Sequence, residues 1–126
     1  DSGVYVNGGR GLLRNTILVS HTVGLRVPIG SVLLDHVLWY SNTVGHTAGA
    51  GTITITQSVE ADPFLAADGY HLTPTSTAAI DAGASAQVSA DVDGEPRSGT
   101  PDIGADEYWA PGALKRMYLP IVLSAV

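Results

Sequence analysis

A spacing of twenty-one residues recurs through the first half of this chain and limits the possible folds more than any other feature. The tripeptide Thr22-Val23-Gly24 returns as Thr43-Val44-Gly45, and glycine recurs in two series at the same interval. The two series are Gly3, Gly24, Gly45 and Gly9, Gly30, Gly51. A fixed period of this size is typical of stacked copies of one small unit, each burying its apolar face only against its neighbours. The period therefore predicts a solenoid over residues 1–61.

Within each repeat, apolar and polar residues alternate with a period of two, which is the pattern of a strand with one buried face. The columns predicted to face the interior are Val4, Leu25, His46; Val6, Val27, Ala48; Gly11, Val32, Ile53; Leu13, Leu34, Ile55; Ile17, Leu38, Val59; and Val19, Tyr40, Ala61. The columns predicted to face outward are Tyr5, Arg26, Thr47; Leu12, Leu33, Thr54; and Leu18, Trp39, Glu60. Glycines between these runs suit corners, where the chain turns with a positive φ or backbones crowd together.

We therefore predict an all-β fold, a single-stranded, right-handed parallel β-helix of about three turns with three short strands in each 21-residue turn. The hand follows from the strong preference of parallel crossover connections for right-handed geometry. Three turns at roughly 4.8 Å each would make a rod only about 14 Å long. The first turn has no cap and leaves a strand edge unpaired, which invites association. We expect the chain to be the C-terminal end of a longer β-helix, with the remainder as its partner on the N-terminal side, and we expect self-association through the uncapped first turn.

The period ends after Ala61, where the chain becomes rich in Asp, Ala, Gly, Ser and Pro. This composition predicts an irregular capping region over residues 62–108. Residues 109–126 are predicted to form an apolar tail strand that docks on the solenoid, because contiguous exposed apolar patches are usually covered. The outward side chains that this tail is expected to cover are Leu12, Leu33 and Trp39.

The charge of the chain argues against nucleic acid as a partner. Six Lys and Arg residues stand against twelve Asp and Glu residues, for a formal net charge of −6 at pH 7, whereas phosphate binding needs clustered Lys and Arg. The sequence contains no Cys, so disulfides and thiolate metal sites are excluded. No apolar run approaches the roughly 20 residues that a transmembrane helix needs.

One motif in the second half has the oxygen spacing of a calcium loop. The segment Asp91-Val92-Asp93-Gly94-Glu95 alternates acidic side chains before and after a glycine, and Ca²⁺ takes six to eight oxygen ligands. Asp91, Asp93 and Glu95 are therefore candidate Ca²⁺ ligands, with Ca²⁺ as the one candidate cofactor. The segment lacks the flanking helices and later Glu of an EF-hand. We favour a tight turn instead, in which Gly94 supplies a positive φ and Arg97 pairs with a neighbouring acid such as Asp102 or Glu107.

A second candidate site is a carbohydrate-binding face. Trp39 and Tyr5 are predicted to project outward from a rigid scaffold, where an aromatic ring can hold a sugar. The alternative is that Trp39 packs beneath the tail, which we favour because large exposed apolar patches are uncommon. The predicted outward columns contain no pair of carboxylates about 5–9 Å apart, as glycoside hydrolysis would require. We therefore predict no catalytic residue in this segment.

An ordered set of motifs in the second half carries a family resemblance. The motifs are Asp62-Pro63-Phe64-Leu65, Tyr70-His71-Leu72, Ala79-Ile80-Asp81-Ala82-Gly83, Asp91-Val92-Asp93-Gly94-Glu95-Pro96-Arg97 and Asp102-Ile103-Gly104-Ala105-Asp106-Glu107-Tyr108. Residues 62–108 thereby resemble the C-terminal region of secreted bacterial right-handed β-helix proteins of the pectin-lyase-like superfamily, including choice-of-anchor and polymorphic outer-membrane-type surface proteins. The resemblance implies that these motifs close the C-terminal end of a solenoid at an extracellular or cell-surface location.

The function that follows is non-catalytic. The chain is expected to cap and display an extracellular β-helix that acts in adhesion or surface attachment. Two alternatives stay open at this point. One is the terminal part of a polysaccharide lyase or hydrolase, and the other is a calcium-stabilised carbohydrate-binding module. Either alternative would make a polysaccharide the partner.

Overall fold

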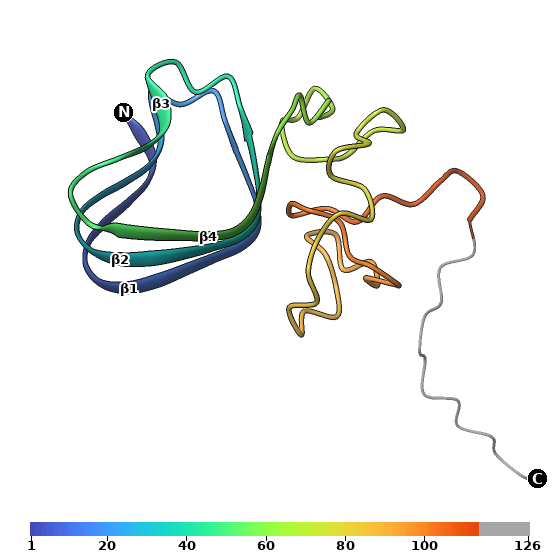
Figure 1. Cartoon of the computed structure of the whole chain (residues 1–126). Helices are drawn as coiled ribbons and strands as arrows, with labels where there is room; N and C mark the ends of the chain where they lie inside the picture. Colours follow the sequence, from blue (N-terminus) through green and yellow to red (C-terminus); the bar gives the residue numbers. More distant parts are fainter. Residues whose placement is uncertain (114–126) are drawn as a thin grey trace, which may run out of the picture.

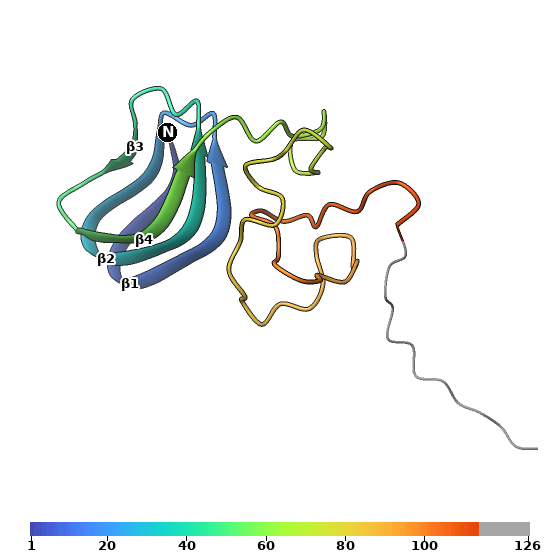
Figure 2. The same cartoon turned by 45° about the vertical axis from the view of Figure 1, so that its right-hand side comes forward.

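In the computed structural model, which describes residues 1–113, the chain is all-β and contains no helix within those residues. Its four strands are β1 (Ser2–Val19), β2 (Val23–Tyr40), β3 (Gly45–Ala48) and β4 (Thr52–Glu60). All pairings are parallel, with β2 in the middle, β1 on one edge, and β3 and β4 on the other. Residues 2–19, 23–40 and 45–60 are called here the first, second and third repeats. Figures 1 and 2 show them as stacked layers that bend around a common interior.

The ladder confirms the 21-residue period for most of the stack. From Arg10, which pairs with Ser31, to Val19, which pairs with Tyr40, every pair of β1 with β2 is twenty-one residues apart. The third repeat departs from this spacing in β3, where Leu25 pairs with Thr47 at an interval of twenty-two. The predicted alignment of His46 with Leu25 is therefore wrong by one residue. The short β3 is followed by a three-residue break before β4.

Each of the two long strands contains a corner, and the predicted facing changes for the residues that follow this corner within the strand. Asn15 and His36 occupy equivalent positions and have φ values of 50° and 57°. The sequence predicts separate short strands, but β1 and β2 are each one strand of 18 residues that bends at these left-handed positions. A residue with positive φ interrupts the pleat, so the inward and outward positions exchange beyond it.

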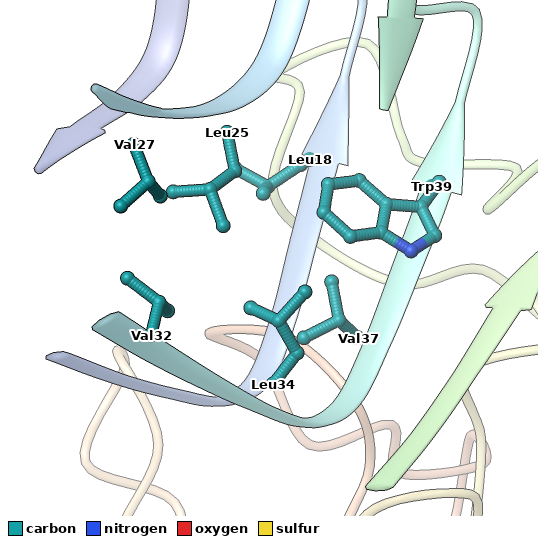
Figure 3. Packing of buried hydrophobic residues seen from close by; sticks show 7 residues of the cluster. All are labelled: Leu18, Leu25, Val27, Val32, Leu34, Val37 and Trp39. Carbon is teal, nitrogen blue, oxygen red and sulfur yellow. The ribbon is translucent and has the colours of Figure 1, made fainter. Parts of the chain in front are cut away.

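The prediction that Leu18 and Trp39 face outward is therefore wrong, whereas Glu60 of the same predicted column is exposed. Leu18 and Trp39 are 4% and 3% exposed and belong to the interior cluster. Figure 3 shows Trp39 next to Leu18 and Val37, with its ring directed toward the interior that the other labelled side chains share. The adjacent columns exchange accordingly. Leu38 packs against residues that follow the strands, outside the interior, and Tyr40 is 37% exposed.

The interior is filled mainly by the second repeat. The buried residues of the interior are Leu18 from the first repeat and, from the second repeat, Leu25, Val27, Val32, Leu34, Val37 and Trp39. Leu25, Leu34 and Val37 are fully buried, and each such side chain contributes about 1.5–3 kcal/mol relative to an exposed position. The second repeat is buried more completely than its neighbours because only it has a layer on both sides.

The two ends of the stack present different chemistry. At the first repeat the interior positions are apolar, and Val4, Val6 and Leu13 pack partly buried against the core. At the third repeat Glu60 pairs in the ladder with Trp39. The His46 ring stacks on Trp39 with centroids 5.2 Å apart, and its Nε2 lies 3.2 Å from Glu60 Oε2. The His46 ring thus covers Trp39 at this end, while Ile53 of β4 packs against the core as an apolar residue.

Residues 61–113 form an irregular extension that lies beside the layers (Figures 1 and 2). A second apolar cluster joins the two parts, with Leu38 and Ile17 from the layers packed against Leu72, Ala79 and Ile103 from the extension. The extension thus contacts a lateral face of the layers, and its expected role in closing the end of a solenoid stays a prediction. The predicted tail strand over residues 109–126 falls mostly on residues 114–126, which lie outside the described residues.

Asn15 is the main polar link between the layers and the extension. Its Nδ2 donates to Ala84 O at 2.7 Å, and its Oδ1 accepts from Ala84 N at 2.7 Å. Its backbone oxygen also accepts from Gly104 N at 2.8 Å. Gly104 fits closely there, since an added Cβ would lie 2.9 Å from Ile17 Cδ1. One corner residue thus holds two segments of the extension against the first repeat.

Candidate functional site

Acidic side chains organise the extension by accepting hydrogen bonds from its backbone. The N–H groups that they accept from belong to Phe64, Tyr70, His71, Leu72, Asp81, Asp93, Glu95, Ser98, Asp102, Glu107 and Tyr108. Backbone donors outside regular ladders need such partners. The concentration of acids after residue 61 therefore has a structural explanation in most cases.

The Asp91 motif forms the favoured turn. Asp91 Oδ1 accepts from Asp93 N at 3.0 Å and from Glu95 N at 2.8 Å, while Oδ2 accepts from Glu107 N at 3.1 Å. Gly94 has a φ of 80°. Both oxygens of Asp91 are thus engaged by the backbone. Of the three candidate calcium ligands, only Asp93 belongs to the one group of potential metal-binding side chains found within residues 1–113.

Arg97 lies at the centre of the extension and is paired as the sequence predicts. Its Nη1 donates to Glu107 Oε2 at 3.1 Å and to Asp102 O at 3.3 Å. Its Nη2 donates to Gly104 O at 2.8 Å and Ala105 O at 3.0 Å. Burial raises the pKa of the neighbouring Asp102 carboxyl. This largely buried guanidinium, bonded through both terminal nitrogens, orders the surrounding loops.

His71 joins two loops through its two ring nitrogens. Nδ1 lies 2.5 Å from Asp68 Oδ2, and Nε2 lies 2.6 Å from Asp93 Oδ2. The hydrogen bond with Asp68, followed by that with Asp93, raises the pKa of His71 to about 9. The same contact, with support from backbone N–H groups, lowers the pKa of Asp68 to about 2. As an imidazolium, His71 is a charged link between residue 68 and the turn at residue 93.

Asp106 completes this junction from a third segment. It is 6% exposed, and its Oδ2 accepts from Leu72 N at 2.7 Å. Burial raises the pKa of its carboxyl. One ligand atom each from His71, Asp93 and Asp106 lies within 4.8 Å of the other two. An imidazole nitrogen and two carboxylates can hold a divalent cation.

The sequence does not single out His71 or Asp106 as ligands, because they lie thirty-five positions apart in irregular chain. The available signal was their presence in two of the ordered motifs of the second half. No periodicity places those motifs side by side, so the grouping depends on the fold of the extension.

The two aromatic candidates are not brought together. Trp39 lies inside the layers and offers no exposed face to a sugar, so the outward position that its role in carbohydrate binding required is absent. Tyr5 is 59% exposed on β1, in agreement with its predicted facing. A two-aromatic sugar platform built from these residues is therefore not formed.

A cleft of about 380 Å³ opens where the extension meets the corner at Asn15. It is lined by Arg14, Gln87 and Arg97 among others. The Arg14 guanidinium lies 2.6 Å from Asp35, and Arg97 is paired with Glu107. Both cationic groups of the cleft are thus already matched by carboxylates.

No family model, curated protein or solved structure matches this chain. Within the described residues there is also no helix of the length and apolarity that a bilayer crossing requires.

Proposed function

We propose that this chain is a non-catalytic structural module, the C-terminal end of a longer right-handed parallel β-helix. In this proposal the three repeats are the last turns of the solenoid, and earlier turns stack on the free edge of β1. The extension then buttresses the final turns from the side. The resemblance of residues 62–108 to secreted bacterial β-helix proteins supports an extracellular or cell-surface location, with a role in adhesion or attachment.

The observation that carries this proposal is the difference between the two ends of the stack. The first repeat offers one long strand whose interior positions are apolar, including the partly buried Val4, Val6 and Leu13. The third repeat has a short β3, a slipped register and, over Trp39, the His46 ring that pairs with Glu60. Apolar interior positions favour another layer, whereas a short, interrupted edge strand with polar side chains disfavours further pairing. The stack is therefore suited to continue from its N-terminal end and to stop at the third repeat.

The alternatives find less support in the site chemistry. A carbohydrate-binding module needs an exposed aromatic face, and Trp39 is buried. A lyase or hydrolase needs carboxylates free to act on substrate, and those of Asp91, Asp102 and Glu107 accept backbone hydrogen bonds. These acids serve the fold of the extension.

The stacking proposal is tested by adding one repeat. A copy of residues 23–43 placed directly before Ser2 continues the 21-residue period and gives β1 a partner on its free edge. We expect a single cooperative unfolding transition with Tm raised by about 5 °C or more, and slower amide exchange in β1. The control carries the same residues in scrambled order. Equal Tm for both extended chains would refute the proposal.

The non-catalytic part is tested by titrating the chain with neutral and acidic polysaccharides while tryptophan fluorescence is followed. The titration is run with calcium and again with a chelator. We expect no saturable change in either condition. A saturable, calcium-dependent change would support a binding module or an enzyme fragment instead.

A further inference from the structure

We propose that His71, Asp93 and Asp106 form a binding site for a divalent transition-metal cation, for which Zn²⁺ is the probe. The three residues come from separate segments of the extension, and their ligand atoms lie within 4.8 Å of one another. The site uses no residue of β1, so the inference is independent of the stacking proposal. Its role is to fasten the irregular extension where no strand ladder does so.

The donor set determines the class of cation. Imidazole nitrogen suits Zn²⁺ and other first-row transition metals, whereas Ca²⁺ and Mg²⁺ prefer oxygen alone. Zinc takes His nitrogen and carboxylate oxygen at about 2.0–2.2 Å, which places neighbouring ligand atoms about 3.4 Å apart. His71 Nε2 and Asp93 Oδ2, now 2.6 Å apart, would have to separate, and any pair near the upper limit of 4.8 Å would have to approach. Three protein ligands would leave a coordination position for solvent.

Asp106 offers the cation a largely buried carboxylate. The residue is 94% buried, being 6% exposed, and a buried carboxylate normally needs full pairing. Within residues 1–113, Leu72 N–H is the one hydrogen-bond donor to its side chain, and it bonds Oδ2. The other carboxylate oxygen has no protein donor within these residues and is not fully buried, so it is accessible to an exogenous ligand. A cation between Asp106 and Asp93 would bind that oxygen in place of solvent.

The surrounding groups suit such an ion. Asp68, Asp93 and Asp106 bring three carboxylates around one imidazole. Asp68 holds Nδ1 of His71, so that Nε2 faces Asp93, and a carboxylate behind a metal-ligating histidine commonly fixes the ring in this way. The cation would take the place of the proton that Nε2 shares with Asp93, since a ligating histidine must be neutral there.

The test uses the full chain, freed of metal with a chelator and then titrated with ZnCl₂ by calorimetry and by thermal unfolding. We expect one ion per chain and a Tm that rises with Zn²⁺ concentration. Asp106→Asn keeps an acceptor for Leu72 N–H but removes the charge, and it should weaken binding tenfold or more. Asp93→Asn, at a more exposed position, should weaken binding as well. Asp81→Asn, another exposed acid of the extension, should leave binding unchanged.

Three results would overturn the proposal. The first is the absence of heat and of any Tm shift with Zn²⁺ in the wild-type chain. The second is undiminished binding in Asp106→Asn and Asp93→Asn, which would place the ion elsewhere. The third is a response to Ca²⁺ but not to Zn²⁺, which would contradict ligation by His71. Folding of each metal-free variant is checked by circular dichroism, and long-range ¹H–¹⁵N spectra of the His71 ring should shift at Nε2 on addition of Zn²⁺.

Discussion

In the stacked repeats, the backbone groups of one layer bond those of the next, whereas in the extension carboxylate side chains accept many of the backbone N–H groups. The repeats need only a periodic sequence, because the ladder between β1 and β2 satisfies the backbone hydrogen-bonding groups of any sequence that keeps the apolar columns. The extension needs particular residues at particular places, such as Asp91, which accepts three N–H groups. Regular structure therefore distributes its stability over many equivalent bonds, while irregular structure concentrates it in a few side chains.

The largest test of this comparison is a charge placed in the interior of the repeats. Leu34→Asp buries a carboxylate where Leu34 is fully buried, which should destabilise the chain by about 4 kcal/mol or more and abolish the folded state. Circular dichroism and urea unfolding measure the effect. Leu33→Asp is the matched control, because Leu33 is 39% exposed on the opposite face of the same strand. A normal transition for Leu34→Asp would show that the facing of β2 is wrong.

The next test asks whether one side chain supports the extension. Arg97→Ala removes the partner of the buried Glu107 and leaves three carbonyl groups without their donor. We expect a loss of about 3–5 kcal/mol in the extension, seen as faster amide exchange over residues 62–108 while β2 keeps its protection. Arg10→Ala, at an exposed position of β1, should change neither. If β2 lost protection equally, the two regions would be one cooperative unit.

A smaller effect is expected at the junction. Asn15→Gly keeps the left-handed corner but removes both side-chain bonds to Ala84, which should cost about 1–3 kcal/mol. His36→Gly changes the equivalent corner of β2, which makes no such bonds to the extension. Urea unfolding of the two variants should therefore show the greater loss for Asn15→Gly. The reverse order would mean that the apolar contacts of Leu38 hold the extension without Asn15.

The smallest effect concerns acid sensitivity within the repeats. The hydrogen bond from His36, followed by Arg14, lowers the pKa of Asp35 below its usual value, against the opposing effect of burial. The stability from these contacts is present above a pH of about 3.8 and is lost as the pH falls through the lower folded pKa. Asp35→Asn should therefore make unfolding free energies less dependent on pH between about 2 and 5. Asp81→Asn is the control, and an unchanged slope in Asp35→Asn would contradict the assignment.

The all-β fold and the period of β1 and β2 could be predicted because identical columns must meet at a fixed interval. The facing of Trp39 could not be predicted by alternation, because Asn15 and His36 interrupt the pleat without any glycine to mark the corner. The turn at Asp91 could be predicted, because the order of Asp, Gly and Pro in this segment is typical of a tight turn. The junction of His71 with Asp106 was not, since Asp106 meets Leu72 across thirty-four positions of irregular chain.

The attachment of the extension through Asn15 has a mechanical consequence. The chain leaves the layers from β4, so a pull on residue 113 along the covalent path would first load the most exposed strand of the stack. The contacts of Asn15 and Leu38 offer a second route, which leads to the first and second repeats. Tension is thereby shared with the inner layer, and the outermost strand is relieved of peeling force. In a module that ends a tethered fibre, this arrangement would lower the rate of unfolding under a pulling force.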